Sequence, residues 1–274
     1  MSVTFKDWDS FCKFAAGFAC YRVDQISDLP DHTSNWIVIK HDIEADVEKA
    51  LRVARIEAQY GIMATYYVQL DLMTNDNASI WREIQRLGHE VTYHYDVLDA
   101  CNGDLARASA QFAEAIARFN NLGFEVRTVC PHGNPMLRRS GWSSNKDFFR
   151  SKDNREVFST IFDLVVDGKR KIRTPYHYIS DAGYSWKVVA DIENNDRVGS
   201  NDRKLEGLSE IQRLLIDGNC LIVSSHPHRF SKSLAGLAIR VALFRVARVM
   251  ARIFAGIPGV RNLLSRLYKY SRFV

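Results

Sequence analysis

Strand-like and helix-like stretches alternate along most of the chain, and this alternation restricts the possible folds more than any other feature. Apolar, β-branched runs at 36–40 and 64–68 are each followed by an amphipathic stretch, and the pattern returns in a last run at 220–225. Repeated strand–helix units predict an α/β protein with a parallel sheet and external helices, either open or closed into a barrel. A first helix is expected over residues 4–21, whereas residues 136–160 look irregular.

Length and composition restrict the class of protein further. With 274 residues, of which 46% are hydrophobic, the chain can form one large α/β domain or two small ones. Five scattered cysteines form no CxxC pair, which argues against a disulfide framework and a thiolate zinc site. Neither a secretory signal nor a run of about 18 apolar residues is recognised, so a cytoplasmic location is expected.

Positive charge is concentrated at the C-terminus. Residues 231–274 hold nine of the 37 basic residues and none of the 32 acidic ones, which predicts a domain at 1–230 and a basic tail at 231–274. Apolar residues of the tail recur at helical spacing, opposite to arginines: Ile239, Leu243, Val246, Met250 and Ile253. Such a helix either lies on an anionic membrane or a partner, or packs on the domain with solvated arginines. No nucleic-acid-binding module is recognised, so nucleic acid is not an expected partner.

Acidic residues and histidines follow the ends of four predicted strands. Asp42 and Glu44 lie two residues apart, so an extended backbone turns both to the same side. His94, His132 and His226 each follow a different strand. Active sites of parallel α/β folds lie at the carboxyl ends of the strands, so we expect these side chains to share one pocket. Imidazoles and carboxylates are ligands of zinc and similar divalent ions.

Residues 40–230 resemble the polysaccharide deacetylase superfamily of metal-dependent carbohydrate esterases. The matching pieces are His41-Asp42-Ile43-Glu44, the helix at 50–57 with the strand Ala64-Thr65-Tyr66-Tyr67-Val68, the segment from Gly88-His89-Glu90-Val91 to His94, and His226-Pro227. The resemblance is nearest to a branch found among cell-surface polysaccharide biosynthesis proteins. It implies a distorted (β/α) barrel at 1–230 with a C-terminal helical extension.

The chain departs from the family pattern in its metal-binding motifs. Ile43 separates two acids that are adjacent aspartates in the family, and Leu98 stands where a second metal-binding histidine is usual. His132, in a Pro-His-Gly segment that replaces an arginine-bearing motif, is the candidate for the missing nitrogen ligand. The resemblance then implies that Glu44, His94 and His132 hold a divalent ion, with zinc the expected metal.

The resemblance also implies hydrolysis of an N-acetyl group. Asp42 would be the general base and His226 the acid that protonates the leaving amine, and exchanging the roles of Asp42 and Glu44 fits the sequence equally well. Three residues are candidates for supporting roles: His41, Asp96 and Asp181. Each has an open alternative: His41 could pack in the core, Asp96 could cap a helix, and Asp181 could be solvated at the surface.

The expected substrate is an N-acetylated sugar, nucleotide-linked or lipid-linked, because no signal for secretion is recognised. The segment 136–160 offers cations for phosphates and rings for stacking on a sugar, unless these side chains pack the loop down: Arg138, Arg139, Lys146, Arg150, Trp142, Phe148 and Phe149. Two other functions fit the same residues. One is a metal-dependent phosphoesterase on a similar barrel, and the other is a metal-free sugar-binding or scaffolding protein at the membrane.

Overall fold

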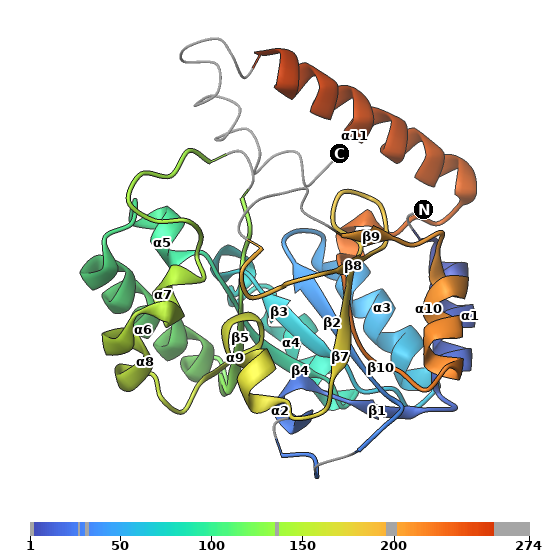
Figure 1. The fold of residues 1–274 in the computed structure, drawn as a ribbon, viewed down its shortest axis with the longest axis horizontal. Helices are drawn as coiled ribbons and strands as arrows, with labels where there is room; N and C mark the ends of the chain where they lie inside the picture. Colours follow the sequence, from blue (N-terminus) through green and yellow to red (C-terminus); the bar gives the residue numbers. More distant parts are fainter. Residues whose placement is uncertain (1–2, 27, 31–32, 135–136, 196–201, 255–274) are drawn as a thin grey trace.

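The computed structural model shows an α/β domain built around one twisted sheet (Figure 1). It describes residues 3–26, 28–30, 33–134, 137–195 and 202–254, without the side chains of 247–248 and 251–254. The strand order is β6-β5-β4-β3-β2-β10-β7-β8-β9, with β1 paired to β2 outside this order. Strands β8 and β9 are antiparallel to their neighbours, and the other pairs are parallel. Within these residues no pairing joins β6 to β9, so hydrogen bonds do not close the barrel.

The elements confirm the predicted α/β class and its alternation. The strands are β1 Ala19–Tyr21, β2 Trp36–Ile43, β3 Thr65–Val68, β4 Glu90–Tyr95, β5 Thr128–Pro131, β6 Phe162–Asp163, β7 Tyr176–Ser180, β8 Lys187–Val189, β9 Arg203–Lys204 and β10 Cys220–Ser225. The α-helices are α1 Phe5–Ala15, α2 Val23–Ile26, α3 Val47–Gln59, α4 Ala78–Arg86, α5 Val97–Ala100, α6 Leu105–Asn121, α7 Asp147–Arg150, α8 Lys152–Val157, α9 Leu164–Lys171, α10 Leu208–Ile216 and α11 Leu234–Phe254. Two short 3-10 helices are η1 Leu70–Leu72 and η2 Pro227–Arg229.

Strand β2 lies in the middle of the sheet and separates two cores. All eight of its residues are buried, and successive side chains point to opposite faces. Ile37 and Ile39 belong to the large core between the sheet and the outer helices, whereas Trp36 and Val38 belong to a smaller core on the inner face. By the same alternation, Lys40 and Asp42 of β2 lie on the inner face, and His41 between them lies on the face towards the helices.

Local sequence signals explain where the main helices begin and end. Thr4 and Asp7 form a reciprocal capping box at the start of α1. The side chain of Asp46 accepts a hydrogen bond from the backbone N–H of Lys49 and caps α3. That helix is followed by Gly61, whose φ of 69° lies in the left-handed region that glycine adopts without strain.

Two sequence-based expectations about the elements were wrong. The first helix ends at Ala15, not near residue 21, because Ala19–Tyr21 pairs with Trp36–Val38 as strand β1. Helical periodicity in the sequence cannot show such a pairing between distant segments. The segment 136–160 is not irregular throughout, because it contains the short helices α7 and α8.

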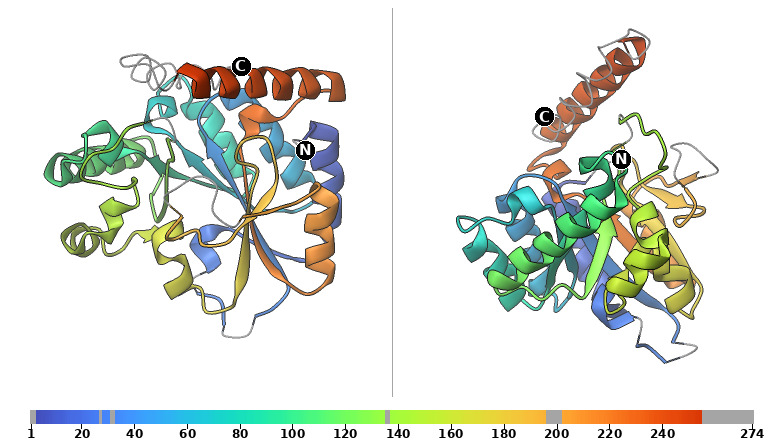
Figure 2. Two further views of the ribbon diagram at one scale, coloured as in Figure 1. Left: turned by 45° about the horizontal axis from the view of Figure 1, so that its top comes forward. Right: turned by 90° about the vertical axis from the view of Figure 1, so that its left-hand side faces the viewer.

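Helix α11 continues the chain beyond η2 and lies across one end of the domain (Figure 2). Its first turns contact the body: Nη1 of Arg240 donates to the backbone oxygen of His228 at 3.2 Å, and the ring of Phe244 lies 4.9 Å from that of Tyr184. The tail expected at 231–274 is therefore helical up to residue 254, and the rest of it lies outside the described residues. Within the described part, no helix is both long and apolar enough to cross a membrane.

Candidate active site and metal site

Four neighbouring or nearby strands of the sheet, β2, β4, β5 and β10, carry polar residues at or just after their carboxyl ends. Asp42 lies at the end of β2 with Glu44 just after it, His94 lies near the end of β4, His132 follows β5 and His226 follows β10. We call these five residues the site cluster. All of them are buried, with exposed fractions between 3% and 7%. The structure thus brings together the residues that the sequence predicts to share a pocket.

Three imidazoles surround Glu44. Its Oε1 lies 3.4 Å from Nε2 of His132, 3.7 Å from Nε2 of His226 and 4.0 Å from Nε2 of His94. Burial disfavours the charged carboxylate, but the imidazoles outweigh this effect, His132 most strongly, and hold the pKa of Glu44 well below its usual value. Glu44 is therefore an anion among nitrogen atoms.

Asp42 is held by a buried lysine that the sequence analysis did not single out. Nζ of Lys40 donates to Oδ1 and Oδ2 of Asp42 at 2.7 and 3.0 Å, and the Ser224 hydroxyl donates to Oδ2 at 3.2 Å. Burial opposes both charges, yet their attraction prevails: the pKa of Lys40 is raised and the pKa of Asp42 is lowered. The signal in the sequence was one charged residue inside an apolar strand, two positions before Asp42 and hence on the same face.

His226 is oriented by Asp181, which follows β7. Nδ1 of His226 lies 2.5 Å from Oδ1 of Asp181, and the backbone N–H of His226 donates to Oδ2 at 3.2 Å. Burial opposes the charge on Asp181, but His226 and Arg229 outweigh it and lower the pKa of that carboxyl group. Nε2 of His226 then faces the two carboxylates, 3.9 Å from Oδ2 of Asp42 and 3.7 Å from Oε1 of Glu44.

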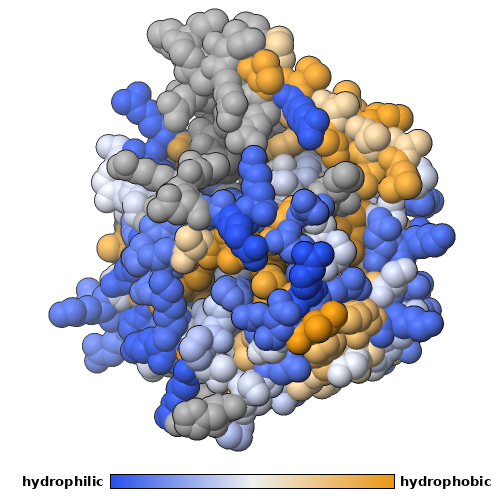
Figure 3. All heavy atoms as spheres, turned by 45° about the vertical axis from the view of Figure 1, so that its right-hand side comes forward, coloured by the Kyte–Doolittle hydropathy of each residue, from blue (hydrophilic) through white to orange (hydrophobic). Residues whose placement is uncertain are grey.

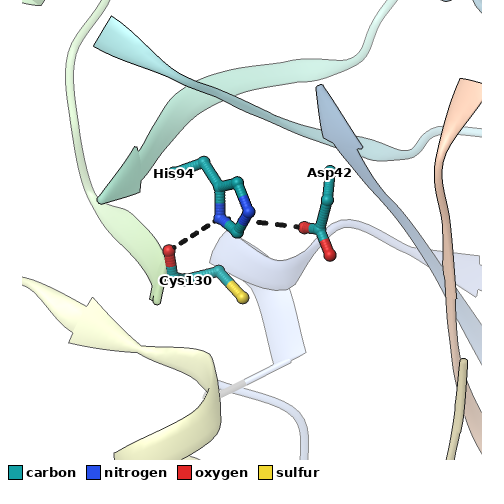
Figure 4. Close-up of side chains that lie close together, drawn as sticks. All are labelled: Asp42, His94 and Cys130. Atoms are coloured by element: carbon teal, nitrogen blue, oxygen red, sulfur yellow. Dashed lines mark hydrogen bonds and ion pairs between the residues drawn. The ribbon is translucent and has the colours of Figure 1, made fainter. Parts of the chain in front are cut away.

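His94 lies between Asp42 and Cys130 (Figure 4). Its Nδ1 is 2.9 Å from the backbone oxygen of Cys130 and 4.0 Å from Oδ1 of Asp42. Burial lowers the pKa of His94 to about 4, so the ring is neutral at neutral pH. A carbonyl group can only accept, so Nδ1 carries the proton and Nε2 keeps its lone pair. A neutral imidazole held in this way is the usual form of a metal ligand.

Asp42, His94 and Cys130 form a buried group that could hold a metal ion, because one ligand atom of each lies within 4.8 Å of the others. Lys40 already occupies part of this group: its Nζ donates to Sγ of Cys130 at 3.0 Å as well as to Asp42. Burial raises the pKa of Cys130 to about 12, which keeps the sulfur a thiol, whereas metals bind the thiolate. A metal ion at this group would therefore compete with the ammonium of Lys40.

The donors around Glu44 are of the chemical type that a zinc-type ion binds, because imidazole nitrogens and carboxylate oxygens are its usual ligands. Ligand atoms about 2.0–2.2 Å from a tetrahedral zinc ion lie roughly 3.3–3.6 Å from one another. Nε2 of His132 lies within this range of Oε1 of Glu44, at 3.4 Å, whereas Nε2 of His226 and Nε2 of His94 lie beyond it, at 3.7 and 4.0 Å. His228 adds a second observation: its ring centroid is 5.8 Å from that of His226, and its buried Nδ1 has no hydrogen-bond partner among the described residues. Buried nitrogens are usually paired, so this atom is consistent with a polar group bound beside the cluster.

His41 lies on the opposite face of β2 from Asp42, so the structure favours packing over the supporting role considered for it. Its Nε2 is 2.7 Å from Oε1 of Glu57, and its Nδ1 is 2.8 Å from the hydroxyl of Ser225. The same glutamate accepts hydrogen bonds from Trp8 at 3.1 Å and from the hydroxyl of Tyr66 at 2.6 Å. We call Trp8, His41, Glu57 and Tyr66 the helix-side network.

Asp96 remains a candidate for orienting His94, whose Nδ1 faces the backbone oxygen of Cys130. It precedes α5 and is half-buried, and its side chain forms no hydrogen bond that caps this helix. The cap considered for Asp96 is therefore not seen at α5, and its role in orienting His94 stays a prediction.

The segment 136–160 packs against the domain through most of the side chains considered for substrate binding. Arg139 binds both oxygens of Asp99 at 2.7 and 2.6 Å, and Nε1 of Trp142 donates to the same carboxylate at 2.9 Å. Phe148 and Phe149 are buried in an aromatic cluster, so of the two alternatives considered for them the structure shows packing of the loop and not exposure to a sugar. Arg138 is exposed. Substrate binding by Arg138, Arg139 and Trp142 stays a prediction.

No family model matches the sequence, and no curated protein matches it. Solved structures are similar in fold. A CE4 esterase of Streptococcus mutans is 16% identical over 86% of this chain and 90% of its own, with a TM-score of 0.42. The catalytic domain of a peptidoglycan N-acetylglucosamine deacetylase from Eubacterium rectale is 12% identical over 80% and 87%, with a TM-score of 0.44. A family 4 carbohydrate esterase from Streptomyces lividans is 13% identical over 77% and 88%, with a TM-score of 0.42.

Proposed function

We propose that the chain is a metal-dependent carbohydrate deacetylase that removes N-acetyl groups. The observation that carries this proposal is the arrangement of two buried carboxylates with different partners: Glu44 faces three imidazoles, and Asp42 is bound to Lys40. This difference favours Glu44 as the ligand and Asp42 as the base, although the sequence alone left their roles open. His94 and His132 complete the proposed ligand set, and zinc is the proposed ion.

The residues of the chain divide the work of amide hydrolysis. A bound divalent ion lowers the pKa of its water and polarises a carbonyl group. Asp42, kept ionised and fixed in place by Lys40, takes the proton of the attacking water. His226, held by Asp181, gives a proton to the nitrogen as the C–N bond breaks, which releases acetate and a free amine. Oδ2 of Asp42 and Nε2 of His226 lie 3.9 Å apart, so the two proton-transfer groups lie next to each other and can serve the same small reacting group.

The proposed substrate is an N-acetylated saccharide, linked to a nucleotide or to a lipid, that serves in the biosynthesis of a cell-surface polysaccharide. What supports this part is the resemblance of the motifs and the basic tail at 231–274. A cytoplasmic protein that associates peripherally with the inner face of a membrane would meet such precursors.

The proposal predicts that His94→Ala loses bound zinc and acetate release together. His177→Ala is the matched control, because His177 is exposed in β7. Elemental analysis of the purified proteins, followed by acetate assays on nucleotide-linked and lipid-linked N-acetyl sugars, gives both readouts. Unchanged metal content in His94→Ala would refute the ligand assignment. Phosphate release from phosphomonoesters, with no acetate from any N-acetyl sugar, would favour the phosphoesterase instead.

A further inference from the structure

Helix α11 presents a stripe of apolar side chains to solvent. The exposed fractions are 61% for Ile239, 49% for Leu243, 61% for Val246 and 46% for Met250. These positions follow one another at steps of four, three and four residues, which places them on one face of the helix. Another face packs on the domain, where Leu237 is buried and Phe244 contacts Tyr184. Figure 3 shows apolar side chains gathered at this part of the surface.

The charge around the stripe has one sign. The sequence of α11 contains four arginines and no acidic residue, and residues 231–274 contain no acidic residue at all. An anionic lipid surface complements both properties, since apolar side chains enter the acyl boundary while the arginines meet the headgroups. A second copy docked stripe to stripe would cover the apolar side chains only, and would bring no negative charge to the arginines of the helix.

We propose that α11 docks on an anionic membrane and lies in the plane of its interface. The helix has 21 residues, and within the described chain no helix is apolar enough to span a bilayer. A lying helix needs only one apolar face, and the stripe supplies it.

Docking through α11 would hold the site end of the domain at the membrane. Arg240 and Lys49 both donate to the backbone oxygen of His228, at 3.2 and 2.8 Å, so the helix is attached to the turn that follows His226 (Figure 2). If the chain is the proposed deacetylase, this attachment favours the lipid-linked sugar over the nucleotide-linked one as its substrate.

Vesicle sedimentation of the full chain tests the proposal without an activity assay, so its failure is distinct from failure of the proposed function. Phosphatidylcholine vesicles with and without phosphatidylserine are the probe. Wild type is expected to sediment with the anionic vesicles and much less with the neutral ones. Val246→Glu, on the stripe, is expected to bind about tenfold more weakly. Ala238→Glu adds the same charge at an exposed position off the stripe and is expected to lose much less binding.

Equal binding by the two variants would overturn the proposal, because it would leave charge alone to explain the attraction. Equal binding of wild type to neutral and anionic vesicles would also overturn it. A third contrary result is absence of vesicle binding together with a dimer, seen by light scattering, that Val246→Glu dissociates. That result would assign the stripe to a second copy of the chain. Circular dichroism of both variants checks that the fold is retained.

Discussion

Two buried glutamates lie on opposite faces of β2 and differ in how closely their partners approach. On the helix side, the carboxylate of Glu57 accepts hydrogen bonds at 2.6–3.1 Å from Tyr66, His41 and Trp8. On the inner side, Oε1 of Glu44 lies 3.4–4.0 Å from three imidazole nitrogens. The first carboxylate has three short hydrogen bonds, whereas the three imidazole nitrogens lie farther from the second.

The pKa values do not separate the two sites. Burial opposes ionisation of both glutamates, and imidazoles outweigh it in both cases, so the pKa of each carboxyl group is lowered. Geometry separates them instead. A perturbed pKa therefore identifies a buried charge with partners, and does not by itself distinguish a candidate metal ligand from a structural residue.

Glu44 and Glu57 have similarly lowered pKa values, but replacing each by glutamine should have different consequences. The largest effect, on turnover and zinc binding, is expected for Glu44→Gln. Loss of the anionic ligand should reduce turnover by more than the roughly 10- to 100-fold typical of a residue that only orients a ligand. Zinc should no longer raise the melting temperature, because binding to the folded state is lost. The measurements are zinc content, acetate release and thermal unfolding with and without zinc. Retained zinc and turnover would show that Glu44 is a structural residue like Glu57.

Glu57→Gln should have the opposite profile. The amide keeps one oxygen for the donors of the helix-side network but loses its negative charge, so the free energy of unfolding should fall by about 2 kcal/mol. For a domain of this size the melting temperature should then fall by roughly 4–8 °C. The folded variant should bind zinc with the wild-type stoichiometry. Loss of zinc at unchanged stability would contradict this prediction. It would mean that zinc binding on the inner face of β2 depends on the helix-side network.

The sequence predicted the strand ends of the site well, because period-two alternation and parallel topology are properties of short segments. Asp42, His94, His132 and His226 lie where these rules put them. It could not predict which buried charge would pair with which. Lys40 binds Asp42 only because the inner face of β2 is closed off from water by neighbouring strands, and that enclosure depends on residues far away in the sequence.

The error at β1 and the question left open for the segment 136–160 have related physical causes. Strand β1 was taken for the end of a helix because its pairing with β2 is a long-range contact. Phe148 and Phe149 looked available for a sugar because burial by Tyr95, Phe112 and Phe158 involves four separate segments. Asp99 accepts hydrogen bonds from Arg139 and Trp142. The sequence alone does not indicate this, because an aspartate is usually expected at the surface.

Glu90 extends the comparison to a buried carboxylate that accepts hydrogen bonds from hydroxyl groups. Thr65 donates to Oε2 and Thr128 donates to Oε1, both at 2.7 Å. Here burial raises the pKa of Glu90 to about 7, against the opposing effect of these donors. Neutral donors thus leave a buried glutamate largely protonated, whereas the imidazoles around Glu44 and Glu57 keep those carboxylates charged.

Glu90→Gln should therefore change the free energy of unfolding with the opposite sign to Glu57→Gln. The folded state binds the proton of Glu90 more tightly than the unfolded chain, so this carboxyl group makes stability fall as the pH rises from about 4.5 towards about 7. An amide cannot ionise, and the variant should be more stable than wild type by about 3 kcal/mol above this range, with the advantage vanishing at lower pH. Urea unfolding at a series of pH values measures the difference. A constant difference between the two proteins across the series would mean that Glu90 stays charged in the fold, and hydroxyl donors would then suffice to keep a buried glutamate ionised.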